Sequence, residues 1–188
     1  MPKIENVQVC GIEDSFRASK FPFAVDVNKV NGEKTDKIVS LATCKAGTGH
    51  DNFLNGIIVQ FDLTFSIKAW VEAERYHFFD FVSSQSTMHC ISKMDIRPMC
   101  NVYVSEVIIA EVERLKQVFL NDRTDDNYLR LLYNVPVGFE LTARMTTNYR
   151  QLKTMYMQRT THRLPDWHIF CDFIENLPHS ELITGKEQ

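Results

Sequence analysis

The sequence has no long hydrophobic run, because its apolar stretches extend over only a few residues before a charged residue interrupts them. A helix needs about 18 to 20 consecutive apolar residues to cross a bilayer, so no membrane-spanning segment is expected. The first residues, Met1 to Asn6, include an acid where a secretory signal peptide carries its apolar segment. We therefore expect a cytoplasmic protein that has no membrane partner.

Paired motifs for metal or redox chemistry are also missing. The five cysteines are scattered, and no two of them have the two-residue separation of zinc or redox motifs. The histidines form no His-x-x-x-His pair, and His162 and His168 are six residues apart, which places them on different faces of a helix. We expect free thiols and no metal site.

Charge of one sign does not dominate the chain. The 188 residues carry 21 Lys and Arg against 24 Asp and Glu, a net charge of −3, and 44% of them are hydrophobic. These values exclude a disordered chain and a uniformly basic nucleic-acid-binding protein. No repeat, low-complexity tract or linker interrupts the sequence, and its length suits a single domain over residues 1–188.

Two segments alternate strictly between apolar and polar residues, at 59–67 and at 137–145. A period of two is typical of a half-buried strand, and two such strands favour an antiparallel sheet. Helical patterns cover 35–44, 68–81, 104–119 and 125–133, then 148–159 with Asn148 as N-cap, and a last helix with Pro165 in its first turn that ends before Leu177. This order predicts an α+β domain.

Residues 144–163 contain five Lys or Arg and no Asp or Glu, although the chain is acidic. In a helix that begins at Asn148, the cap amide and the guanidinium of Arg159 share one stripe, about 16 Å apart. Such a helix can contact two parts of a nucleotide, since guanidinium and helix N-termini both bind phosphate. One alternative is a solvated basic face, and another is a surface for single-stranded nucleic acid, which the net charge disfavours.

A second candidate segment runs through Tyr76-His77-Phe78 and, seven residues later, Ser86-Thr87-Met88, with Gln85 in the polar run between them. Polar loops that follow helices often hold ligands. The serines lack the Gly-x-Ser-x-Gly turn of a hydrolase nucleophile, and Gly47-Thr48-Gly49 lacks the remainder of a dinucleotide or phosphate-loop motif. The segment therefore indicates binding more than covalent catalysis.

Together these segments resemble the flavin-dependent thymidylate synthases, the ThyX family. The family signature is Arg-His-Arg, seven residues, then Ser-x-Arg. His77 and Ser86 keep their places and spacing, whereas Tyr76, Phe78 and Met88 replace the three arginines. Arg75, one position before the signature, is a candidate replacement for one of them.

The C-terminal half carries more of the resemblance. The family has a proline, twelve residues later an asparagine, two later an arginine and nine later another arginine, and these steps are met by Pro136, Asn148, Arg150 and Arg159. A third match is partial: His50 precedes the first alternating strand, as in the family, but Gly56 stands where the family has its second histidine. The resemblance spans about residues 47–172.

The resemblance implies a single ThyX-like α+β domain whose antiparallel sheet is packed with helices. It also implies FAD as cofactor and a pyrimidine nucleotide such as dUMP as substrate, although the replaced arginines remove positive charge from the place where the family holds them. Flavin-binding positions carried over from the family are His50, His77, Asn148 and Arg150, and nucleotide-binding positions are Gln85, Ser86 and Arg159. No residue is assigned a catalytic role, because flavin carries the chemistry in this family.

Two hypotheses of different classes follow from the resemblance. The first is a flavin-dependent (deoxy)uridylate methyltransferase, in which NADPH reduces the flavin and a folate supplies the methylene group. The second is a catalytically inactive nucleotide-binding or regulatory protein of viral origin. The family's sites form between subunits, so the resemblance implies a homo-oligomer, a tetramer, in either case.

Overall fold

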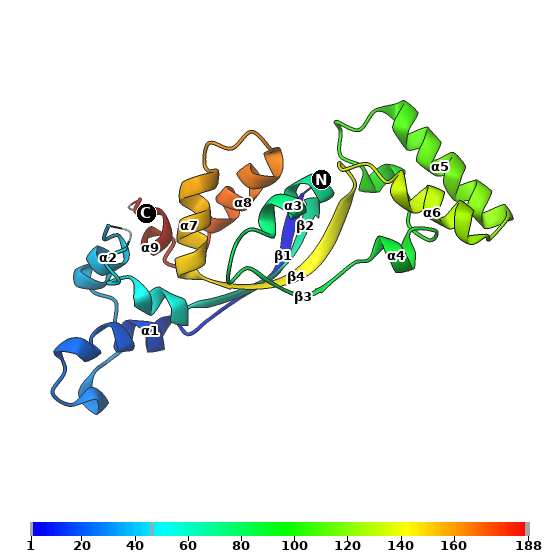
Figure 1. Cartoon of the computed structure of the whole chain (residues 1–188). Helices are drawn as coiled ribbons and strands as arrows, with labels where there is room; N and C mark the ends of the chain where they lie inside the picture. The colour runs from blue at the N-terminus through cyan, green and yellow to red at the C-terminus, as the bar shows by residue number, and fades with distance from the viewer. Residues whose placement is uncertain (1, 46, 187–188) are drawn as a thin grey trace.

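The computed structural model describes residues 2–45 and 47–186 of the chain (Figure 1). In chain order the elements are β1 (Lys3–Cys10), α1 (Ile12–Ser19), η1 (Phe21–Phe23), η2 (Val27–Lys29), α2 (Asp36–Ala42), η3 (Asn52–Gly56), β2 (Ile58–Ser66), α3 (Ile67–Ala73), β3 (Asp80–Ser84), α4 (Thr87–Cys90), η4 (Arg97–Met99), α5 (Glu106–Asn121), α6 (Asp125–Tyr133), β4 (Glu140–Asn148), α7 (Tyr149–Arg159), α8 (Pro165–Glu175) and α9 (Glu181–Thr184), where η marks 3₁₀ helices. Within the described ranges, none of the helices combines the length and the apolar character that a bilayer span requires.

The four strands form one antiparallel sheet in the order β1-β2-β4-β3. β2 and β4 are neighbours whose pairing runs from Ile58 opposite Asn148 to Ser66 opposite Glu140. The two alternating segments therefore lie side by side, which confirms the α+β class and the antiparallel sheet. β4 begins three residues later than predicted, because Val137 lies in a turn before the strand and is 63% exposed.

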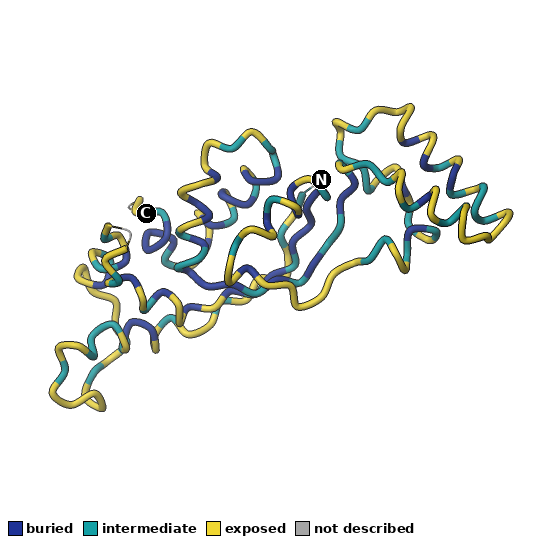
Figure 2. Tube along the Cα trace, viewed as in Figure 1, coloured by how far each residue is buried: buried dark blue, intermediate teal, exposed yellow. Residues whose placement is uncertain are grey.

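The apolar face of β2 builds the main core with α8 (Figure 2). Phe61 contacts Phe170 with ring centroids 6.1 Å apart, and Phe65 contacts Trp167 at 5.1 Å. All four side chains are fully buried. Burial of a phenylalanine contributes about 2 kcal/mol, so this aromatic layer fixes α8 against the sheet.

The predicted helices at 35–44, 104–119, 125–133 and 148–159 correspond to α2, α5, α6 and α7. Asn148 caps α7, because its side-chain oxygen accepts a hydrogen bond from the backbone N–H of Gln151 at 2.9 Å. α8 starts at Pro165 as expected, but it is not the last helix, since α9 follows it. All five cysteines are free thiols.

The predicted helix over 68–81 is wrong in its second half. α3 ends at Ala73, and β3 begins at Asp80. Phe78 has a φ of +58°, a left-handed conformation that an α-helix cannot contain. Next to it, Phe79 turns inward and packs against Phe61, so core burial redirects this aromatic run toward the sheet edge. His77 therefore lies in a turn and not at a helix end.

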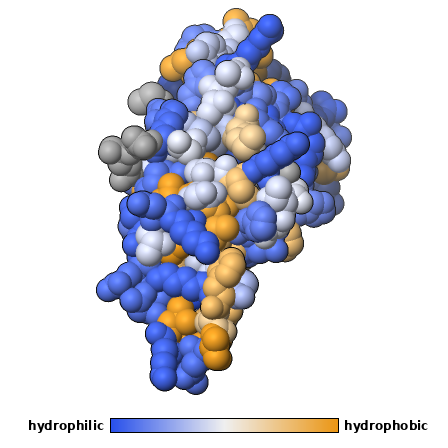
Figure 3. Space-filling model, turned by 90° about the vertical axis from the view of Figure 1, so that its left-hand side faces the viewer, coloured by the Kyte–Doolittle hydropathy of each residue, from blue (hydrophilic) through white to orange (hydrophobic). Residues whose placement is uncertain are grey.

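A second, smaller core lies in the lobe formed by α5 and α6, at one end of the elongated molecule (Figure 1). Its buried side chains include Ile109, Val112 and Leu131. Leu141, on β4, is partly buried and packs against both cores. At the opposite end, the face shown in Figure 3 is mainly hydrophilic. The segment that contains η1 and η2 carries exposed apolar side chains such as Phe23 and Val25.

Candidate functional site

The basic segment 144–163 is neutralised by carboxylates from elsewhere in the chain. The ion pairs are Arg144–Asp62 at 3.2 Å, Arg150–Asp51 at 3.2 Å, Lys153–Asp51 at 2.9 Å and Arg159–Glu72 at 3.0 Å. Among the residues that the structure describes, Arg163 is the one Lys or Arg of this segment without a carboxylate partner. Most cations of the segment thus form ion pairs within the folded chain, and little of its positive charge is left over for a ligand.

Two neighbouring pockets flank α7, and we call them together the α7 cleft. The Arg75 pocket, of about 540 Å³, is lined by Arg75, Tyr76, His77, Gln151, Thr154, Gln158 and Arg159. The Asn148 pocket, of about 230 Å³, is lined by Gly47, Asp51, Asn55, Phe78, Asn148, Arg150, Gln151, Lys153, Thr154 and Met157. Gln151 and Thr154 line both, so the two pockets share a wall. The cleft brings together four of the predicted residues: His77, Asn148, Arg150 and Arg159.

Tyr76 organises the Arg75 pocket. Its hydroxyl accepts a hydrogen bond from Nε of Arg159 at 2.6 Å and donates one to Oε1 of Gln158 at 3.0 Å. The side chains of Arg75 and His77, on either side of Tyr76, are exposed. The residue that replaces a family arginine therefore anchors Arg159, while its neighbours present cationic or polar groups to solvent.

Arg159 is enclosed on several sides. Its Nη1 donates to Glu72 Oε2 at 3.0 Å, and its Cζ lies 4.2 Å from the ring centroid of Trp167. Trp167 Nε1 also donates to Glu72, at 3.1 Å. The side chain of Arg159 is only 7% exposed, so this guanidinium forms part of the pocket floor.

Glu72 is the centre of this network. Burial alone would raise the pKa of its carboxyl, but hydrogen bonds from Lys68 and Trp167 and the charge of His162 hold that pKa below its ordinary value. His162 Nε2 lies 3.2 Å from Glu72. Burial lowers the pKa of His162 and outweighs the attraction of Glu72, with the nearby charge of Arg159 acting in the same direction as burial. Glu72 is therefore a stable anion at neutral pH, matched to Arg159.

The Asn148 pocket has a different balance of charge. Burial would raise the pKa of Asp51, but the hydrogen bond and charge of Lys153 and the charge of Arg150 hold it below its ordinary value. Two cations thus face one carboxylate, which leaves local positive charge. Phe78, whose side chain is 66% exposed, adds an aromatic surface to the same pocket.

Three predicted residues lie away from the cleft. His50 is exposed in the turn before η3 and lines neither pocket. Gln85 extends the pairing of β3 with β4: its N–H donates to the carbonyl of Thr142, and its Oε1 accepts from the Thr142 N–H. Ser86 follows as the first residue before α4. Thr142 is six residues before Asn148, which is roughly 20 Å along a strand.

Sequence reasoning missed most of the cleft's polar wall. Gln151, Thr154 and Gln158 are spaced three and four residues apart, so they share one face of α7. That spacing is a signal the sequence does contain. The stripe of Asn148 and Arg159, by contrast, is buried and forms the core-facing side of the helix.

The cleft can be tested for its fit to a flavin nucleotide, whose phosphates need cations and whose rings need apolar surfaces. Arg150 and Lys153 outnumber their carboxylate partner, and Phe78 and Met157 are exposed in the same pocket. These residues fit part of such a group. Gln85, which pairs with Thr142 of β4, and Ser86, which follows it, lie too far from Asn148 to complete the site within one chain.

Comparison of the fold with solved structures gives close matches. The crystal structure of thymidylate synthase X (ThyX) from Helicobacter pylori with FAD and dUMP aligns with a TM-score of 0.77 over 98% of both chains, at 14% sequence identity. The chain has the ThyX fold. A further H. pylori ThyX complex with FAD and dUMP aligns with a TM-score of 0.76 over 99% of this chain and all of the other, at 12% identity.

A third solved structure, the UMP/dUMP methylase PolB from Streptomyces cacaoi bound with 5-Br dUMP, matches this chain less closely. It aligns with a TM-score of 0.62 over 93% of this chain and 88% of the other, at 14% identity. No protein-family model matches the sequence, and a search of curated proteins by sequence finds no match. The likeness to ThyX therefore lies in the fold, and the site must be argued from its own residues.

Proposed function

We propose that the protein binds a pyrimidine nucleotide and a flavin in the α7 cleft, as a ThyX-like protein. The observation that carries the proposal is the cleft itself, in which a polar face of α7 lies between the exposed Arg75 and His77 on one side and the positively charged Asn148 pocket on the other. Structures with the same fold hold FAD with dUMP, or 5-Br dUMP.

In this proposal the Asn148 pocket faces the flavin. Arg150 and Lys153 attract its phosphates, Phe78 offers a ring for stacking, and Asn148 orients the first turn of α7 beside them. His77, which lines the neighbouring Arg75 pocket, and His50, which lies outside both pockets in the turn before η3, are proposed as further flavin contacts. When bound, the flavin supplies hydride-transfer chemistry, and NADPH and a folate are the co-substrates of the methyl-transferring form of the function.

The nucleotide phosphate is proposed to bind at the Arg75 pocket, where Arg75 replaces part of the lost signature charge. Arg159 contributes its positive charge from the floor, and Gln158 and Thr154 offer hydrogen-bonding groups. Ser86 and Gln85 are proposed to contact the nucleotide from a second subunit, because they lie roughly 20 Å from Asn148 within one chain. The proposed site therefore requires a homo-oligomer, and the resemblance to ThyX implies a tetramer.

A second candidate function is nucleotide binding without flavin chemistry, as in an inactive or regulatory protein. The hydrogen bond between Tyr76 and Arg159 favours it. An arginine at position 76 would bring a cation to the pocket, whereas Tyr76 instead ties an existing cation to the protein core.

The visible absorbance spectrum of the purified protein, with and without added FAD, separates the two candidates. A flavin-binding protein retains flavin absorbance after gel filtration, and dUMP then raises its melting temperature further. Arg150→Ala is expected to weaken FAD binding at least tenfold, and the exposed Arg123→Ala serves as control. Retention of dUMP without flavin would favour the second candidate, and retention of neither would reject both.

Light scattering tests the shared site. A mass near 21.9 kDa, that of one chain, would leave Ser86 separated from the cleft and would contradict the subunit arrangement proposed here. A mass near four times that value is the expected result.

A further inference from the structure

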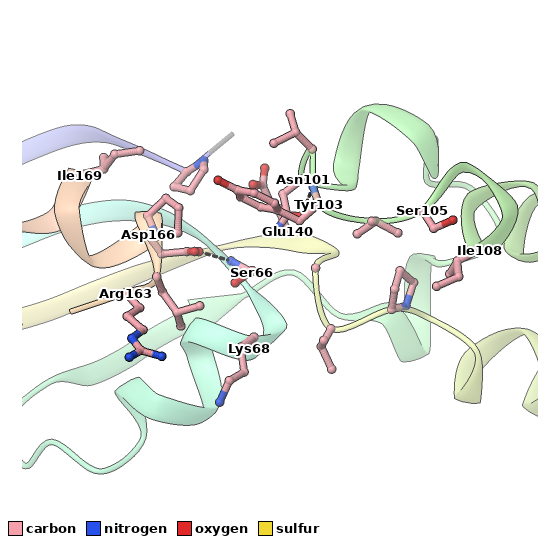
Figure 4. Close-up of a pocket in the computed structure, with 18 residues that line it drawn as sticks. Ser66, Lys68, Asn101, Tyr103, Ser105, Ile108, Glu140, Arg163, Asp166 and Ile169 are labelled. Carbon is pink, nitrogen blue, oxygen red and sulfur yellow. Dashed lines mark hydrogen bonds between the residues drawn. The ribbon is translucent and has the colours of Figure 1, made fainter.

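A further cavity lies outside the α7 cleft. It has a volume of about 710 Å³ and separates the main body from the helical lobe, so we call it the interlobe cavity. Segments 101–105 and 136–138 and Ile108 form the lobe side, and segment 163–166 with Ile169 forms the body side (Figure 4). Cavities of about 300 to 1,000 Å³ are the size at which proteins bind small molecules.

The walls of this cavity are predominantly hydrocarbon. Val102, Tyr103, Ile108 and Val137 line it, and each of these large apolar side chains remains exposed. Covering such residues with an apolar group is favourable, because it removes hydrocarbon surface from water. The cavity therefore favours a ligand with an aliphatic body.

Charge is distributed unevenly around the cavity. Arg163 and Lys68 extend toward the same side of it (Figure 4). Lys68 pairs with Glu72 at 3.0 Å but stays half-exposed, and Arg163 has no carboxylate partner among the described residues. A guanidinium at the edge of an apolar cavity is suited to a two-oxygen anion, which it can bind with two parallel hydrogen bonds.

The buried carboxylate of Asp166 determines which way round an anionic ligand lies in the cavity. Asp166 lines the cavity, is buried, and accepts a hydrogen bond from the backbone N–H of Ser66 at 2.9 Å. An anionic group would be repelled from this wall. The charged end of a ligand consequently belongs at the Arg163 edge, with its apolar end inside.

We propose that the interlobe cavity is a binding site for an acyl carboxylate, with the aliphatic chain between the two lobes and the carboxylate on Arg163. The site shares no residue with the α7 cleft, and it does not depend on the function proposed there. It would link ligand binding to the position of the α5–α6 lobe relative to the sheet.

Calorimetric titration of the full chain with decanoate, without flavin or nucleotide, tests the proposal. Decanoate is expected to bind at one site, and decanol, which has the same chain without the charge, at least fivefold more weakly. Arg163→Gln should remove that difference, whereas the exposed Arg123→Gln should leave it unchanged. No decanoate binding, or equal affinity for decanol, would overturn the proposal.

A cavity-filling variant locates the site. Val137→Trp places a large ring in the interlobe cavity and should weaken decanoate binding at least tenfold. Val107→Trp is the matched control, because Val107 is on α5, next to Ile108, but does not line the cavity. Equal effects of the two tryptophans would place the ligand elsewhere and overturn the assignment. If Val137→Trp does not fold, the Arg163→Gln titration decides alone, because Arg163 is at the surface.

Discussion

The two ends of α7 carry the same kind of ion pair in different surroundings. At the first turn, Arg150 pairs with Asp51 and is 38% exposed. At the last turn, Arg159 pairs with Glu72 and is 7% exposed, beneath Tyr76 and Trp167. Both arginines form an ion pair, so the difference between them lies in how far each side chain is exposed. Arg150 remains accessible to a ligand, whereas Arg159 mainly supports the pocket above it.

The largest loss of stability is expected at the C-terminal end of α7, where the ion pair of Arg159 is buried. Glu72→Gln removes the carboxylate that faces Arg159 and leaves a buried cation without its counter-charge, so the free energy of unfolding should fall by about 3 kcal/mol. Denaturant unfolding measures this change. Glu74→Gln, an exposed neighbour, should change it by less than about 0.5 kcal/mol. Similar losses in both variants would show that enclosure does not distinguish the pair.

A smaller loss of stability is expected at the N-terminal end of α7, where the ion pair of Arg150 is partly exposed. Asp51→Asn weakens charged hydrogen bonds from Lys153 and Arg150 and should cost about 2 kcal/mol at neutral pH. Because the pKa of Asp51 in the folded protein lies below its ordinary value of 3.8, its stabilisation is complete above that pH and is lost as pH falls through the folded value.

Unfolding measured from pH 7 to pH 3 checks this sign. The gap in stability between the natural chain and Asp51→Asn should shrink toward acid pH. The exposed Asp95→Asn is the control and should show a small gap at every pH. A gap for Asp51→Asn that widens with acid would contradict the assignment.

The smallest loss of stability is expected for substitutions of Asn148, and these also test whether Asn148 only caps α7 or binds flavin as well. Asn148→Ala should lose about 1 kcal/mol, because the hydrogen bond to Gln151 N–H is removed, whereas Asn148→Ser keeps a capping oxygen and most of the stability. If the amide of Asn148 also contacts flavin, FAD binding falls in both variants. Normal FAD binding in Asn148→Ser would leave Asn148 as a cap alone.

The interior of the sheet could be predicted from sequence, and its edges could not. β2 and β4 lie in the middle, with one face on the core, so their residues alternate. β1 and β3 are the edge strands: β1 carries a register shift between Glu5 and Gln8, and every residue of β3 is exposed. A strand that buries neither face has no physical reason to alternate apolar and polar residues, so the sequences of β1 and β3 carry no period of two.

The site divides in a similar way. Spacing within one helix predicted that Asn148 caps α7 and that Arg159 ends it, because helical geometry fixes those relations. Spacing could not predict that Glu72, 87 residues earlier, would pair with Arg159, or that Asp51, 99 residues earlier, would pair with Arg150. Those partners are chosen by the packing of α7 on the sheet, which the local pattern does not contain.

Leu141 packs against both the main core and the core of the α5–α6 lobe, so it lies where the two cores meet. The two cores raise the question of whether the molecule unfolds as one cooperative unit. Two separate hydrophobic cores can open separately, as distinct units of amide hydrogen exchange. Amides in α5 and α6 are then expected to exchange through openings of the lobe that leave β2 and β4 protected. This expectation divides the molecule into a more stable half, which holds the α7 cleft, and a half whose opening costs less free energy.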